Sequence, residues 1–327
     1  MRSPLETKTL VTNQPLNPGL NQISTILPVG EMWKAMVLTF KHTVVIGNGA
    51  GAIALGEYRI IKGVNLKTDK NELISDNVPG LGLYPIHYRH DRVAPYHVPV
   101  AAASATYRAM LKIPFGLSWL AKPEDFYINS RRYKSLELTI TMGGPADLYT
   151  APGTATVVST LDISLVRSNA NLWAPDKRSM NLSLPHKIPY FKHLPVLDPT
   201  AIPYWDLESA EDFWITDFQL SMGDTTAVAG VPYSGTPVDG IDGVSFEDNV
   251  HTFLTAVPVE FFVQLRRKLL GADLPGAYLY TFIPNGSYRE AYKTKQKSEL
   301  KLRWNTAAGT APVQADLVLI GYRNPKA

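Results

Sequence analysis

The second half of the chain repeats the motif order of the first half, and this duplication restricts the possible fold more than any other feature. In the first half the sequence Ile-Pro-Phe-Gly at Ile113–Gly116 precedes the segment Lys134–Leu138. In the second half Ile-Pro-Asn-Gly at Ile283–Gly286 precedes the similar segment Lys297–Leu302. The 327 residues also exceed the usual size of one hydrophobic core and suit two domains of roughly 150 residues. We therefore expect two related units in tandem.

The composition favours an all-β fold for both units. The apolar content of 45% is enough to build packed cores, and the 25 prolines and 23 glycines are spread along the whole chain. Such spacing is typical of many short strands joined by turns. Apolar and polar residues alternate with a period of two in four long stretches, which predicts strands with one buried face. These stretches are Met32–Ile46, Ser135–Met142, Thr154–Val166 and Phe213–Met222.

Other segments predict a single helix and several loops. Pro258–Leu270 carries an apolar stripe of helical spacing, begins with proline and is followed by Gly271, so we expect a helix there. The Pro- and Tyr-rich segment Pro79–Pro99 and the Gly- and Pro-rich segment Gly223–Gly243 are interpreted as long surface loops. Residues 168–178 are interpreted as the linker between the units.

Three parts follow from this pattern. Residues 1–20 are interpreted as an extended N-terminal arm because three prolines interrupt them, residues 21–170 as the first unit, and residues 171–327 as the second. Arg2 and Lys8 place positive charge on the arm, where it could meet an anionic lipid head group or an adjacent subunit. We expect the arm to serve assembly and not folding, so that deleting Met1–Gln22 would leave the thermal stability nearly unchanged.

No segment carries a recognisable catalytic or metal-binding set. The chain has no cysteine. Gly47–Ala52 satisfies a permissive dinucleotide fingerprint, but the residues after it look β-like, so a turn between strands is the better interpretation. The histidines of His87–His97 lie between prolines without a helical pattern and are interpreted as polar residues of an exposed loop. The carboxylates of Asp206–Asp212 form no recognisable acid pair. We predict no enzyme activity, no metal and no cofactor.

Charge and targeting signals point to a protein made in the cytoplasm. The formal net charge of +3 gives no case for sequence-specific binding of nucleic acid. Two basic clusters, Arg131–Lys134 and Arg266–Lys268, are interpreted as solvated faces or salt bridges between subunits. The first residues do not resemble a secretory signal, and no apolar run is long enough to cross a bilayer.

With these motifs in place, the chain resembles the double jelly-roll major capsid proteins of the lineage that joins adenovirus hexon with tailless, membrane-containing bacteriophages. In the first half the resemblance is carried by Glu31–Ile46, Tyr107–Gly116, Tyr133–Met142 and Thr154–Val166. Their counterparts in the second half are Phe213–Met222, Ala277–Gly286, Ser298–Trp304 and Asp316–Gly321. The resemblance implies two eight-stranded antiparallel jelly-roll sandwiches in tandem, with a short flanking helix.

The resemblance also implies a function as a viral structural protein. In that family three copies form a trimeric, pseudo-hexameric capsomer, and capsomers tile an icosahedral shell, which the resemblance implies encloses a lipid membrane. The implied partners are further copies of the chain, minor capsid and vertex proteins, and viral membrane lipids, and the implied location is the virion. The alternative is a two-domain β-sandwich that binds glycans, as in a lectin or phage spike, because the 6 tryptophans and 16 tyrosines could stack on sugars.

Overall fold

A computed structural model describes residues 6–46, 51–167, 187–194, 197–198, 204–207, 213–223, 241–248, 252–270, 277–294, 300–306 and 314–324. The chain divides into two compact units, Met1–Tyr190 with Asn324–Ala327, and Phe191–Arg323. The predicted boundary at residue 170 lies outside the described residues. Among the described residues, no helix is long and apolar enough to cross a membrane.

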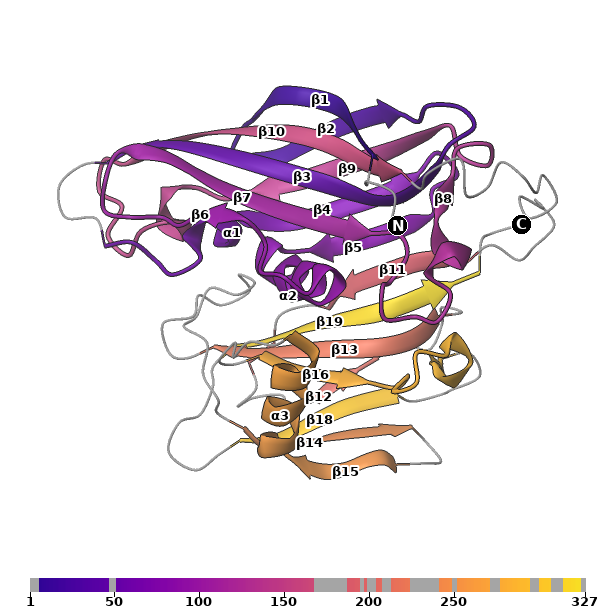
Figure 1. Cartoon of the computed structure of the whole chain (residues 1–327). Coiled ribbons are helices and arrows are strands. Elements are labelled where there is room, and N and C mark those ends of the chain that lie inside the picture. The colour runs from indigo at the N-terminus through magenta and orange to yellow at the C-terminus, as the bar shows by residue number, and fades with distance from the viewer. Residues whose placement is uncertain are drawn as a thin grey trace. The chain divides into compact units, whose positions relative to one another are not determined.

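The first unit is a sandwich of two antiparallel four-stranded layers (Figure 1). One layer has the order β1 (Glu6–Leu16), β10 (Thr156–Arg167), β3 (Met32–Val45) and β7 (Ala105–Pro114), with the two-residue strands β6 (His97–Val98) and β8 (Ile128–Asn129) added at its margins. The other has the order β2 (Gly19–Ile26), β9 (Ser135–Met142), β4 (Ile61–Thr68) and β5 (Leu73–Val78). The unit also contains the helices α1 (Gly56–Arg59) and α2 (Gly80–Asp91).

The second unit repeats this strand order. Its first layer runs β11 (Ile188–His193), β19 (Gln314–Arg323), β13 (Phe213–Gly223) and β16 (Ala277–Thr281), and the two-residue β17 (Tyr292–Lys293) also pairs with β13. Its second layer runs β12 (Tyr204–Asp206), β18 (Leu300–Thr306), β14 (Ile241–Asp248) and β15 (Thr252–Pro258). In both units the first long strand pairs with the last, the last with the third and the third with the sixth. The other layer joins the second, seventh, fourth and fifth, which is the jelly-roll order.

Each unit also carries one helix between its fifth and sixth long strands. In the first unit α2 packs against β7, and in the second α3 (Val259–Leu270) packs against β16 (Figure 1). The Ile-Pro-x-Gly motifs stand at the end of the sixth strand in both units, at Ile113–Gly116 and Ile283–Gly286. The duplication in the sequence is therefore a duplication of topology.

Alternating burial builds the core of each sandwich. In β9 the side chains of Leu136, Leu138, Ile140 and Met142 are buried, and the side chains between them are half-buried on the outer face. In the second unit Phe218 of β13 lies 6.3 Å from Phe246 of β14, ring centre to ring centre, which brings the two layers into contact. The same ring also contacts Tyr280 and Phe262 of α3. Aromatic contacts of this kind add to the stabilisation from burial alone.

Most of the predicted elements are confirmed, and three predictions are wrong. The four alternating stretches and the helix over 258–270 are confirmed by β3, β9, β10, β13 and α3. Pro79–Pro99 is not a loop, because α2 occupies most of it. Helix α2 buries residues on all sides, so its sequence has no apolar stripe, and it contains Pro85 and two glycines. The residues after Gly47–Ala52 were expected to be β-like, but Gly56–Arg59 form the short helix α1, which is the second correction. The interpretation of Gly223–Gly243 as a loop falls mostly outside the described residues.

The N-terminal arm is the third correction. Residues from Glu6 to Leu16 form β1, which pairs with β10 along its whole length, so they belong to the sandwich. The Leu16 side chain is buried, and the backbone N–H of Asn13 donates to Asp162 at 2.7 Å. Asp162 in turn forms an ion pair with Lys41 at 2.7 Å. Proline is compatible with this strand because β1 lies at the edge of its layer, where one side of the backbone needs no hydrogen-bond partner.

We expect the two faces of β9 to differ sharply in how well they tolerate a charged side chain. Leu138→Asp or Ile140→Asp places an unpaired carboxylate between the layers and should prevent folding. Thr139→Asp, on the outer face, should change the melting temperature only slightly. Thermal melts followed by circular dichroism measure the difference, and equal damage from Thr139→Asp and Leu138→Asp would contradict this facing of the strand.

Removing β1 should destabilise the protein, contrary to the expectation for a free arm. A chain that begins at Asn17 loses the buried Leu16 and exposes the edge of β10, so its free energy of unfolding should fall by at least about 2 kcal/mol. Leu16→Ala should reproduce much of this loss. Leu20→Ala is the matched control, because Leu20 is 65% exposed. Denaturant unfolding measures all three variants, and an unchanged midpoint for the truncated chain would show that β1 is dispensable.

Candidate functional site

The end of the first unit where β10 finishes holds a pocket of about 460 Å³ lined by Thr7, Lys8, Glu31 and Arg167. Thr7 and Lys8 come from β1, Arg167 is the last residue of β10, and Glu31 directly precedes β3. The antiparallel pairing of Glu6 with Arg167 and of Trp33 with Arg167 brings these strand ends together. The pocket therefore follows directly from the jelly-roll order.

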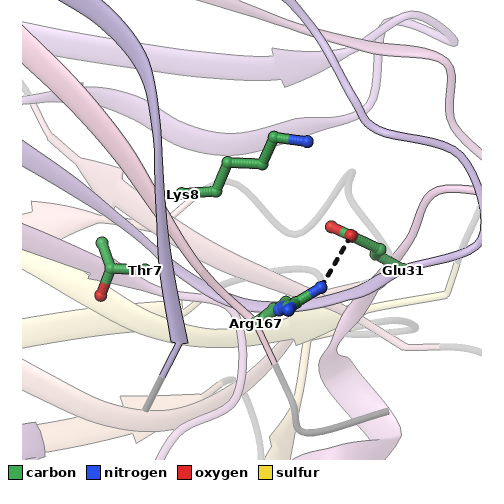
Figure 2. Close-up of a pocket in the computed structure, with 4 residues that line it drawn as sticks. All are labelled: Thr7, Lys8, Glu31 and Arg167. Carbon is green, nitrogen blue, oxygen red and sulfur yellow. Dashed lines mark hydrogen bonds and ion pairs between the residues drawn. The ribbon is translucent and has the colours of Figure 1, made fainter.

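An ion pair forms one wall of this pocket. Arg167 Nη1 lies 3.0 Å from Glu31 Oε1, and both side chains are partly exposed (Figure 2). The second carboxylate oxygen of Glu31 is buried and accepts no hydrogen bond from the described residues. Since the pair is partly exposed, it contributes at most about 1 kcal/mol. The Glu31 carboxylate neutralises the charge of Arg167 but leaves the charge of Lys8 uncompensated.

Lys8 is the one residue lining this pocket that the sequence analysis named as a contact with an anionic lipid head group or an adjacent subunit. Its side chain is exposed and reaches from β1 over the Glu31–Arg167 pair, while Thr7 points to the other side of the strand (Figure 2). The ammonium group makes no ion pair with any residue that the structure describes. Arg2, the other suggested contact, lies outside the described residues. No sequence pattern pointed to Glu31 or Arg167, because only the sheet pairing brings them beside Lys8.

Two of the histidines interpreted as part of an exposed loop, His87 and His90, are instead gathered around one carboxylate on α2, so that prediction is wrong. Asp91 accepts hydrogen bonds from His87 Nε2 at 3.2 Å and from His90 Nδ1 at 2.8 Å, and it also forms an ion pair with Lys112 of β7. Burial by itself would raise the pKa of the Asp91 carboxyl, but the hydrogen bonds from the two histidines and Lys112 outweigh it and hold that pKa well below its usual range. These contacts fasten the end of α2 to β7.

A second buried cluster surrounds Glu57 of α1, whose side chain is fully buried. One carboxylate oxygen pairs with His97 Nδ1 at 2.7 Å, and the other accepts the backbone N–H of Val100 at 3.2 Å. Both carboxylate oxygens are therefore occupied by the segment that follows α2. Among the described residues no group of three or more histidines and carboxylates is arranged to hold a metal ion.

His42 of β3 is buried next to this cluster and remains neutral there. Its Nε2–H donates to the backbone carbonyl of Glu57 at 3.2 Å, so its Nδ1 accepts the hydroxyl hydrogen of Ser159 at 2.9 Å. Burial lowers the pKa of His42 to about 4, although the hydrogen bond to the Glu57 carbonyl opposes that shift. The neutral ring thus satisfies all of its hydrogen-bonding capacity inside the sandwich.

The remaining candidates from the sequence separate into surface and core positions. Arg131 and Lys134 are exposed, as expected for a solvated cluster. Arg266 is buried and donates to the Ala277 carbonyl at 2.9 Å, so it does not belong to a solvated face. The residues Gly47–Ala50 and the carboxylates of Glu208, Glu211 and Asp212 lie outside the described residues.

The burial of His42 should make stability depend on pH over a defined window. The folded state holds the His42 pKa near 4 and the unfolded chain near 6.5, so the unfolded chain binds a proton first as the pH falls. Stability from neutral His42 is complete above pH 6.5 and is lost towards pH 4. Between those values the wild type should lose roughly 3 kcal/mol more than His42→Gln. Urea unfolding at several pH values measures this, and parallel losses in both proteins would contradict it.

Comparison with known proteins agrees with the topology. No protein-family model matches the chain, and no curated protein matches its sequence. Among solved structures, the major capsid protein of Sulfolobus turreted icosahedral virus is similar, with 12% identity over 99% of this chain and 98% of that chain and a TM-score of 0.69. The major capsid protein of bacteriophage PM2 is 14% identical over 98% of both chains, with a TM-score of 0.61.

A third similar structure is the PBCV-1 virus capsid, with 14% identity over 97% of this chain and 93% of that chain and a TM-score of 0.62. These alignments span both units of the chain and nearly the whole of each capsid protein. They agree with the strand order found independently in each unit. The chain therefore has the double jelly-roll fold, the fold of these major capsid proteins.

Proposed function

We propose that the protein is the major capsid protein of an icosahedral virus. The observation that supports this most is the tandem duplication of one complete jelly roll, with a helix at the same place in both copies, over a chain as long as the similar capsid proteins. Three such chains supply six similar units, which lets a trimer occupy a sixfold position of a lattice. The role is structural, and the described buried histidines and carboxylates are engaged in holding elements of the fold together.

The proposed partners follow from this role. Copies of the chain associate into homotrimeric, pseudo-hexameric capsomers, and capsomers meet each other and the minor capsid and vertex proteins of the shell. Viral membrane lipids are a further partner if the shell encloses a bilayer. The protein would be made in the host cytoplasm and end in the virion.

The alternative of a glycan-binding sandwich loses the support that the tryptophans gave it. It depended on exposed aromatic side chains that could stack on sugars. Trp33, Trp205 and Trp304 are buried. The half-buried Trp119 and Trp214 are stacked against Arg89 and Tyr322. None of the tryptophans that the structure describes is therefore available as a sugar platform.

Oligomeric state is the direct test of the proposed function. Size exclusion coupled to light scattering should give the mass of a trimer at micromolar concentration, and negative-stain images of the native assembly should show pseudo-hexagonal capsomers. A strictly monomeric protein that forms no larger assembly with its native partners would overturn the proposal.

A further inference from the structure

The turn between β2 and β3 holds the most exposed apolar side chains of the described residues. Ile26, the last residue of β2, is 81% exposed, and Val29 in the turn is 89% exposed. Single exposed hydrophobic residues are common on protein surfaces and need no explanation. Here the two most exposed examples lie three positions apart on one turn, which sets this place apart from the rest of the described surface.

The turn is held in place on both sides of Val29. Before it, Leu27 is buried and its backbone N–H donates to the Lys134 carbonyl at 2.9 Å. After it, the backbone N–H of Glu31 donates to Ser130 Oγ at 2.8 Å, and the N–H of Ser130 donates to the Glu31 carbonyl at 3.1 Å. Gly30 has a φ of +83°, a left-handed conformation that favours glycine. Val29 is thus presented to solvent by a fixed turn.

Exposed cations come from segments that are hydrogen-bonded to this turn or lie beside it. Lys134 is exposed and bound through its carbonyl to Leu27, Arg131 is exposed next to Ser130, and Lys8 lies above Glu31 in the pocket of Figure 2. None of these three side chains makes an ion pair with a residue that the structure describes. Glu31 is already paired with Arg167, and Asp69, whose N–H donates to the Ser135 carbonyl, offsets part of the positive charge.

We propose that Lys8, Ile26, Val29, Arg131 and Lys134, here called the turn surface, dock on a lipid bilayer that contains anionic lipids. Aliphatic side chains enter the boundary between head groups and acyl chains, and neighbouring cations bind the phosphates, so each contribution reinforces the other. One copy provides only a weak contact. The inference therefore rests on the proposed function, in which many copies face one membrane together.

The chemistry of the turn surface favours a bilayer over another protein. A stable protein interface buries about 1,200–2,000 Å² and usually contains aromatic anchors. Two aliphatic side chains on a narrow turn fall far short of that area, and the turn surface contains no exposed aromatic ring. A bilayer needs no complementary surface, and it compensates unpaired lysine and arginine side chains with its own phosphates.

Flotation with lipid vesicles tests the inference on the full-length trimer. Vesicles of phosphatidylcholine with phosphatidylglycerol should carry the wild type, and vesicles of phosphatidylcholine alone should carry much less. Val29→Asp should weaken binding about tenfold and Lys134→Glu about fivefold. Val93→Asp and Lys268→Glu are matched controls at other exposed positions, Val93 being 66% exposed, and both should bind like the wild type.

Light scattering on the same samples separates this inference from the proposed function. A wild-type trimer that does not float with anionic vesicles overturns the inference and leaves the capsid role standing. Equal binding by Val29→Asp and Val93→Asp also overturns it. If Val29→Asp dissociates the trimer while vesicle binding is unchanged, the turn surface is a contact between copies of the chain. A wild type without any trimer counts against the proposed function itself.

Discussion

The insertion of the last strand between the first and the third is the constraint on which each unit depends. In the first unit β10 pairs with β1 on one side and β3 on the other, and in the second β19 lies between β11 and β13. The partners of β10 lie more than one hundred positions earlier in the chain, so the layer that contains β1, β3 and β7 is not complete until the last strand arrives. Such long-range pairing is characteristic of slowly folding β proteins. It also explains why the N-terminal strand is part of the fold.

This closing strand shapes the pocket at the end of the first unit as well as the core. The end of β10 carries Arg167, which meets Glu31 at the start of β3 and lies beside Lys8 of β1. The turn that presents Val29 joins β2 to β3, one from each layer, and is tied to the segment before β9. A rigid sandwich thus sets the positions of a small group of exposed side chains that no single element could hold.

The buried polar groups serve the same rigidity. Asp91 joins α2 to β7, Glu57 joins α1 to the segment around His97, and His42 links β3 to both α1 and β10. Each group is satisfied by partners from different elements, so breaking one contact leaves a buried polar atom unpaired. These contacts therefore hold the helices and strands of the first unit in fixed positions.

The sequence by itself determined the elements that bury one face only. Alternation identified β3, β9, β10 and β13, helical spacing identified α3, and the repeated motifs identified two copies of one topology. Periodicity reports a difference between two faces, so it is silent where both faces are alike. Helix α2 is buried on nearly all sides and β1 is an exposed edge, and both were misread for that reason. The repeat itself held the missing signal, since α2 occupies the place that α3 occupies in the second unit.

Only the tertiary structure decided how distant residues combine. Lys8 could be recognised as a cation on an N-terminal segment, but its neighbours Glu31 and Arg167 reach it through strand pairing across more than one hundred positions. The gathering of His87, His90 and Lys112 around Asp91 likewise needs a helix and a strand in contact. Local sequence sets which backbone conformation is favoured and which face is apolar. The register between strands far apart in the chain is set by the packing of the whole sandwich.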